Sequence, residues 1–191
     1  KEVPDASRDP RAALMRLYAG VAITDFADNF CQAAYDGGPV VEPPESYAMA
    51  KARLEEAIQI AQAAGADSIV HRARLVLARV HLGLGERTEA LNNARAVPTG
   101  MRWVAHFRDA PGERSFFWGQ NADRGELSIG PRFQDSPDPR TPALNQGRVG
   151  PDRATTVWAQ QKYPTYNDDW VIGNWQEARL IEPEVLLENG D

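Results

Sequence analysis

Residues 73–98, ARLVLARVHLGLGERTEALNNARAVP, decide the fold that we expect for this chain. Apolar residues spaced by three and four predict a helix that opens at Asp67, as N-cap, and closes at Gly83 and Gly85. The buried stripe of that helix would be Val70, Ala73, Leu77 and Val80. A second helix is expected from Glu86 to Val97, because Pro98 cannot continue it.

The order of small and apolar residues in this stretch resembles that of a tetratricopeptide repeat. Its matching positions are Leu77, Ala78, Gly85, Ala90, Ala94 and Pro98. Small residues allow two antiparallel helices to pack closely, and glycine allows the reversal between them. His81 and Arg87 depart from the pattern, since bulky aromatics are common at their positions. One repeat cannot bury its own face, so neighbouring helices are expected.

Three further helices are predicted from the same spacing of apolar residues. The first spans Arg11 to Phe30, with Leu14, Leu17, Tyr18, Val21, Ala22 and Phe26 on its buried face. The second spans Ser46 to Ala64, after a break that Pro43 and Pro44 prolong and before a stop at Gly65, with Ala50, Leu54, Ala57, Ile58 and Ala61 buried. The third spans Asn174 to Glu188 around Ala178, Ile181 and Val185, and Pro183 is expected to kink it or delay its start.

The segment beyond Pro98 changes character and is rich in Gly, Pro, Asp, Arg and aromatic residues. We expect ordered loops with short strands there, such as 102–107 and 115–118. The predicted organisation is a helical scaffold over 1–98, a loop-rich ligand-binding region over 99–173, and the first helix of a truncated pair over 174–191. The fold class is therefore mainly α, with antiparallel helix pairs and short β-hairpins.

Composition excludes several classes of function. The net charge is −6 and the basic residues are scattered, so nucleic acid is not an expected partner. No apolar run is long enough to span a membrane, and the start of the chain at Lys1 has no signal peptide. Because the chain does not begin with Met, and its last helix has no partner, we expect a fragment lacking both ends. Cys31, the single cysteine, is expected to be a packed thiol.

The sequence contains no motif that indicates catalysis. A nucleophile elbow, a phosphate-binding glycine loop and a histidine paired with a nucleophile are all missing. The spacing of His71, His81 and His106 is not that of a metal site. We therefore expect no enzyme, no catalytic residue, no cofactor and no metal.

Aromatic residues beyond Pro98 suggest a sugar-binding surface, because flat rings cover the apolar faces of pyranoses while polar neighbours bind the hydroxyls. The expected ligand-binding residues are Trp118, Asn121, Tyr166, Asp168 and Trp170. Most aromatics in such a region anchor loops instead, and Tyr163 and Trp175 are the expected anchors. Arg140, bracketed by prolines, is expected to tie a loop down.

Several segments, in order along the chain, carry a resemblance to a known family. They are LYAGVAITDFADNFCQAAYDGGPV (17–40), AKARLEEAIQIAQAAGA (50–66), residues 73–98, DPRTP (138–142), KYP (162–164) and WQEARLIEPEVLLENGD (175–191). Together they resemble the SusD/RagB family of outer-membrane nutrient-binding lipoproteins. The last segment is the most specific, although Pro183 stands where the family usually has alanine.

The resemblance implies an α-helical, tetratricopeptide-like superhelix that binds an oligosaccharide or another small nutrient at the cell surface. It implies delivery to a SusC-like TonB-dependent outer-membrane transporter, and membrane attachment only through a lipid upstream of Lys1. Two other functions stay open. One is a tetratricopeptide-type protein interaction scaffold without a small ligand, and the other is an enzyme acting on a glycan, which would need converging carboxylates.

Overall fold

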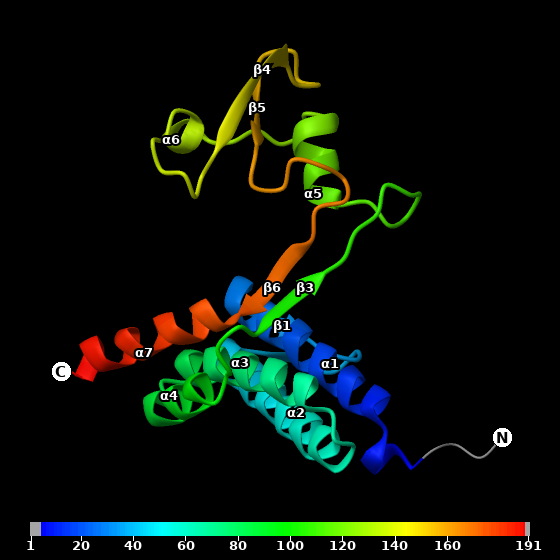
Figure 1. The fold of residues 1–191 in the computed structure, drawn as a ribbon, viewed down its shortest axis with the longest axis vertical. Helices are drawn as coiled ribbons and strands as arrows, with labels where there is room; N and C mark the ends of the chain where they lie inside the picture. Colours follow the sequence, from blue (N-terminus) through cyan, green and yellow to red (C-terminus); the bar gives the residue numbers. More distant parts are fainter. Residues whose placement is uncertain (1–4, 190–191) are drawn as a thin grey trace. The chain divides into compact units, whose positions relative to one another are not determined.

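The structure, a computed structural model, describes residues 5–189. The chain divides into two compact units. The first, here called the helical unit, contains residues 1–103 and 173–191, and the second, the loop unit, contains residues 104–172. Strands β3 (Arg102–Ala105) and β6 (Trp170–Asn174) pair with each other where the chain leaves and re-enters the helical unit (Figure 1).

The first helix of the helical unit, α1 (Pro10–Asn29), packs against α2 (Pro43–Ala63). Asp9 caps α1 through its carboxylate, which accepts a hydrogen bond from the Arg11 amide at 2.9 Å. The short helical turn η1 (Ala6–Arg8) precedes it. The buried residues of α1 are Ala13, Leu17, Gly20, Thr24 and Ala27.

The buried face of α1 differs from the one predicted. Leu17 is buried as expected, but Tyr18 and Phe26 are 45% and 46% exposed. Close packing explains the difference, because a Cβ at Gly20 would lie only 2.6 Å from the Leu54 Cγ. The α1–α2 contact thus selects small residues, whereas the prediction ranked positions by hydrophobicity.

Helix α2 begins three residues earlier than predicted, and Pro43 and Pro44 form its first turn instead of prolonging a break. Proline fits there because the amides of a first turn have no partner within the helix. Helix α3 (Asp67–Gly83) also starts differently, with Ala66 as the N-cap and Asp67 inside the first turn. An acidic side chain at that position interacts favourably with the helix dipole.

Helices α3, α4 (Arg87–Arg95) and α7 (Trp175–Asn189) enclose one hydrophobic core. Its buried members are Leu75, Ala78, Ala90, Ala94, Val97, Ala178, Ile181 and Val185. The turn between α3 and α4 contains Gly85 at a φ of 73°. There the Glu86 amide donates to the His81 carbonyl and the Gly85 amide to the Leu82 carbonyl, which closes α3 with a Schellman motif.

Helix α7 does not start late. It begins at Trp175, its first turn is capped by Asn174, whose side-chain oxygen accepts from the Glu177 amide at 2.9 Å, and it continues through Pro183. Pro183 is exposed, and its ring has no amide hydrogen to donate to the preceding turn of the helix. The predicted stripe of Ala178, Ile181 and Val185 is confirmed as buried.

The remaining strands form two small antiparallel pairs. Strand β1 (Ala33–Ala34) pairs with β2 (Val40–Val41), and β4 (Ala143–Val149) pairs with β5 (Thr156–Gln160). The β4–β5 register aligns Ala143 with Gln160 and is interrupted by a bulge between Asn145 and Val149. The structure thus combines helices, loops and short antiparallel strands.

The strand predicted over 115–118 is wrong. Residues Phe116–Trp118 form the helical turn α5, which continues into the π-helical turn η2 (Gly119–Asp123), and α6 (Pro131–Gln134) follows. The Ser115 carbonyl accepts from the Gly119 amide at 3.1 Å, while the Ser115 amide donates to the Tyr166 carbonyl at 3.1 Å.

Cys31 is exposed, not packed as expected, because it follows the last turn of α1 instead of lying on its buried face. Among the described residues, no helix is both long and apolar enough to cross a membrane.

Candidate functional site

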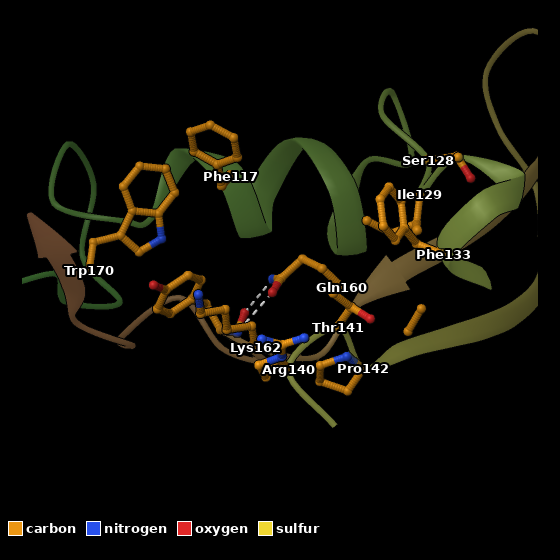
Figure 2. A pocket seen from close by; sticks show the side chains of 13 residues that line it. Phe117, Ser128, Ile129, Phe133, Arg140, Thr141, Pro142, Gln160, Lys162 and Trp170 are labelled. Carbon is orange, nitrogen blue, oxygen red and sulfur yellow. Dashed lines mark hydrogen bonds between the residues drawn. The ribbon is translucent and has the colours of Figure 1, made fainter. Parts of the chain in front are cut away.

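A pocket of about 490 Å³ lies entirely within the loop unit. It is lined by Phe117, Ser128, Ile129, Gly130, Phe133, Arg140, Thr141, Pro142, Ala143, Gln160, Lys162, Tyr163 and Trp170. Figure 2 shows Phe117 and Trp170 at one end and Ile129 and Phe133 at the other, with Gln160, Lys162 and Arg140 between them. The lining thus combines aromatic ends with a basic and amide-bearing middle.

Trp170 is the centre of an aromatic cluster at one end of the pocket. Its ring centroid lies 4.2 Å from that of Phe117, 5.8 Å from that of Tyr163 and 6.3 Å from that of Phe107. Phe117 remains 48% exposed. A cluster of this kind holds the rings in place and still leaves apolar surface available to a ligand.

Gln160, at the end of β5, shapes the middle of the pocket. Its side-chain amide donates to the Tyr163 carbonyl at 2.6 Å, and its side-chain oxygen accepts from the Tyr163 amide at 2.8 Å. These two bonds, drawn as dashed lines in Figure 2, close the turn that carries Lys162. The amide of Gln160 is therefore occupied by the turn, and its role is to position Lys162 and Tyr163.

Asn121 connects backbone segments that border the pocket. It is buried, with 4% exposure, and its amide donates to the carbonyls of Leu127 and Trp158 at 2.8 and 3.1 Å. Its side-chain oxygen accepts from the Gln160 amide at 2.7 Å. Asn121 thus joins η2 to β5 and does not line the pocket, although we expected it to contact the ligand.

Two cationic side chains border the pocket. The Lys162 ammonium lies 5.7 Å from the centroid of the Tyr163 ring. Arg140 forms a two-bond ion pair with Asp138, through Nε at 2.9 Å and Nη2 at 2.6 Å. Hydrogen bonding to that guanidinium lowers the pKa of Asp138 to about 2, so its carboxylate stays ionised. The expected carboxylate contact of Arg140 is confirmed, and the same residue also lines the pocket.

Trp118 and Tyr166 come together, but away from the pocket lining. Their ring centroids are 4.2 Å apart in an edge-on arrangement. The Tyr166 hydroxyl donates to Asp123 at 2.6 Å, and this hydrogen bond raises the pKa of Tyr166. The Arg114 guanidinium covers the Tyr166 ring at 4.6 Å. These contacts hold the 114–123 segment to the 163–168 loop.

The Asp168 carboxylate stabilises the turn that contains it. Its carboxylate accepts from the Thr165 amide at 2.5 Å and from the Thr165 hydroxyl at 2.8 Å. Of the five residues selected from the sequence, only Trp170 lines the pocket.

Sequence reasoning did not select the other aromatic and basic residues of the pocket. They are Phe117, Phe133, Arg140, Lys162 and Tyr163. One usable signal was the KYP segment, which places a cation beside an aromatic ring. Trp175, the other expected anchor, does pack against the helical core.

Metal chemistry has no candidate site in the described part of the chain, where no group of three or more His, Cys, Asp or Glu side chains could hold an ion. The chain matches no protein-family model, no curated protein and no solved structure.

Proposed function

We propose that this protein binds an oligosaccharide nutrient in the pocket of the loop unit and does not turn it over. The observation that carries the proposal is the aromatic cluster of Trp170, Phe117 and Tyr163 at one end of a cavity of about 490 Å³. Aromatic rings cover the apolar faces of sugar rings, and a cavity of this size accommodates a small ligand.

The composition of the lining supports binding in preference to cleavage. Glycoside hydrolysis ordinarily uses two carboxyl groups placed across the scissile bond. The thirteen lining residues, all within the described range, include neither Asp nor Glu. Three carboxylates that lie close to lining residues in sequence, Asp138, Asp168 and Asp169, are engaged by Arg140, Thr165 and His106.

The helical unit supports the finer part of the proposal, a tetratricopeptide-like scaffold of the SusD/RagB type. Helices α3 and α4 pack through Ala78, Ala90 and Ala94, and the turn between them contains Gly85. Together with the ordered segments of resemblance, this packing leads us to propose a surface lipoprotein of the outer membrane. Its partner would be a SusC-like TonB-dependent transporter, and its lipid anchor would lie outside this chain.

The test is a binding screen of the chain against a panel of oligosaccharides, with calorimetry for every hit and chromatography of each ligand after incubation. Trp170→Ala removes the centre of the aromatic cluster and should weaken binding at least about tenfold, a loss typical of a buried aromatic contact. Trp118→Ala is the matched control, because Trp118 is a tryptophan of the same unit that contacts Tyr166 and not the pocket.

Saturable binding that Trp170→Ala weakens and Trp118→Ala preserves, with intact ligand recovered, would support the proposal. If no oligosaccharide binds, or if the recovered ligand is cleaved, the proposal fails. If Trp118→Ala abolishes binding and Trp170→Ala does not, the ligand lies on the Trp118–Tyr166 surface and our choice of pocket is wrong.

A further inference from the structure

We infer that the ligand of this pocket is a carboxylated sugar, such as a uronic or sialic acid, bound through Lys162 and Arg140. The inference rests on the proposed function and narrows its substrate class. It is carried by the juxtaposition of two cations, with no opposing carboxylate in the lining, and an aromatic wall.

The charge of the lining is opposite to that of the chain. The whole sequence has a net charge of −6, yet the lining contains two cations and no carboxylate, and Lys162 remains without an ion pair among the described residues although Arg140 is paired with Asp138. Such a local excess of positive charge attracts anions and raises their concentration near the site. A neutral sugar could accept hydrogen bonds from these groups but would gain no attraction between opposite charges.

Lys162 is the cation that a ligand can use most directly. Within residues 5–189 its ammonium forms no ion pair, and its recorded contact is with the face of Tyr163. The turn that carries Lys162 is held by the two hydrogen bonds between Gln160 and Tyr163. The position of the Lys162 backbone is therefore set before a ligand arrives.

Arg140 keeps a hydrogen-bond donor available although it is paired with Asp138. Asp138 takes the backbone amide, Nε and Nη2 of Arg140. The Nη1 group makes no hydrogen bond with any described residue, so it can donate to a carboxylate oxygen. Because Asp138 fixes the guanidinium on one side, little side-chain entropy is lost when the other side binds.

Trp170 adds a third donor to the same wall. Its indole nitrogen is buried and has no hydrogen-bond partner within the described chain. Figure 2 shows this nitrogen on the edge of the ring that faces the other labelled lining residues. The unpartnered donors of the pocket thus favour a ligand rich in acceptors.

The experiment uses pairs of ligands that differ only in charge. Tri-galacturonic acid is compared with its methyl ester, and sialyllactose with its methyl ester, by calorimetry with the full chain at low salt. Each ester keeps the ring and hydroxyl groups and removes the anion. We expect at least one acid to bind about tenfold or more tightly than its ester, as one charge-assisted hydrogen bond would provide. The two pairs distinguish a uronic from a sialic acid.

Variants then test which side chains cause the preference for the acid. The double change Lys162→Gln with Arg140→Gln should remove the preference for the acid, so that the acid and its ester bind with similar affinity. Arg132→Gln is the matched control, since Arg132 belongs to the same unit and borders Phe133 without lining the pocket. It removes the same type of charge and should preserve the preference. Melting curves of all variants confirm that they remain folded.

Equal or tighter binding of both esters would overturn this inference and leave the proposed function intact. A preference for an acid that survives the double change would also overturn it, because the charge would then be recognised elsewhere. If neither pair binds while a neutral oligosaccharide of the wider panel does, the inference fails and the proposed function stands. If nothing in the panel binds, both fail.

Discussion

At the scale of single residues, small side chains decide how the helical unit packs. Gly20 faces Leu54, which is fully buried, at a distance that no larger side chain could occupy without a shift of α1 or α2. Tyr18 and Phe26, which are more hydrophobic, remain partly exposed on the same helix. A single sequence shows which residues are apolar, but not which helix face a neighbour will approach, and for that reason the α1 face was predicted incorrectly.

Gly20→Leu should therefore destabilise the protein by about 2–3 kcal/mol, because added methylenes overpack a close helix contact. Ala22→Leu is the matched control, since Ala22 is exposed on the same helix, and it should change stability by less than about 0.5 kcal/mol. Chemical denaturation of both variants measures the difference. Equal stability of the two variants would show that α1 and α2 are not packed through Gly20.

At the scale of elements, helix ends and buried helix faces were predictable where a glycine, a proline or a stripe of apolar residues marks them. The ends of α2 and α3 at Gly65 and Gly85 followed from the sequence, as did the buried stripes of α3 and α7. The start of α2 did not, because proline breaks a helix interior but is favourable in a first turn. The α5 turn was missed because three consecutive aromatics have no helical period of their own.

Ion pairs between elements were not predictable from the sequence at all. Glu177 on α7 binds Arg79 on α3 through two hydrogen bonds of 2.5 and 2.8 Å, and both side chains are partly buried. Glu177→Ala should destabilise the protein by about 2 kcal/mol, because it leaves a partly buried guanidinium without this partner. Glu126→Ala breaks the exposed pair with Arg124 and should cost less than about 0.5 kcal/mol. Equal effects on the melting temperature would contradict this difference.

A second prediction concerns pH and the contact of α2 with the α3–α4 turn. Glu86 accepts hydrogen bonds from Lys51 at 2.8 Å and shares one with His81 at 2.6 Å. The Lys51 bond, and then the His81 bond, lower the pKa of Glu86 below its ordinary 4.5. A group with a lowered pKa in the folded state stabilises above its unfolded pKa, and this contribution is lost as pH falls through the folded value.

Glu86→Gln should therefore lower stability modestly at pH 7, by less than about 1 kcal/mol because the side chain is exposed to screening. The difference from the unchanged protein should vanish as the pH falls below 4.5. Thermal melts of both proteins across this range provide the test. A difference that grows in acid would have the wrong sign for this account.

At the scale of the whole molecule, the two units differ in how much apolar surface they bury. The helical unit contains most of the fully buried residues, whereas the loop unit buries few apolar side chains, among them Ala122, Val157 and Ala159. The pocket collects segments around Phe117, Ile129, Arg140 and Lys162 that are separated along the chain. Their residue types were visible in the sequence, but no local pattern shows which of them converge.

Hydrogen exchange should reflect this asymmetry. Amides of α2 and α3 should exchange more slowly than those of β4 and β5 by at least about tenfold, because few buried contacts protect the hairpin. Mass spectrometry of exchanged peptides gives both rates in one experiment. Equal protection of the hairpin and the helices would indicate that the loop unit is stabilised by contacts beyond those described.

The most direct test of the proposed binding site is the indole N–H spectrum of the five tryptophans during titration with the oligosaccharide panel. Tryptophan-to-phenylalanine variants assign the signals. We predict that the ligand shifts the Trp170 signal saturably and leaves those of Trp103 and Trp175, which belong to the helical unit, unchanged. If no panel member moves the Trp170 signal, or if the Trp103 and Trp175 signals respond instead, the pocket of the loop unit is not the binding site.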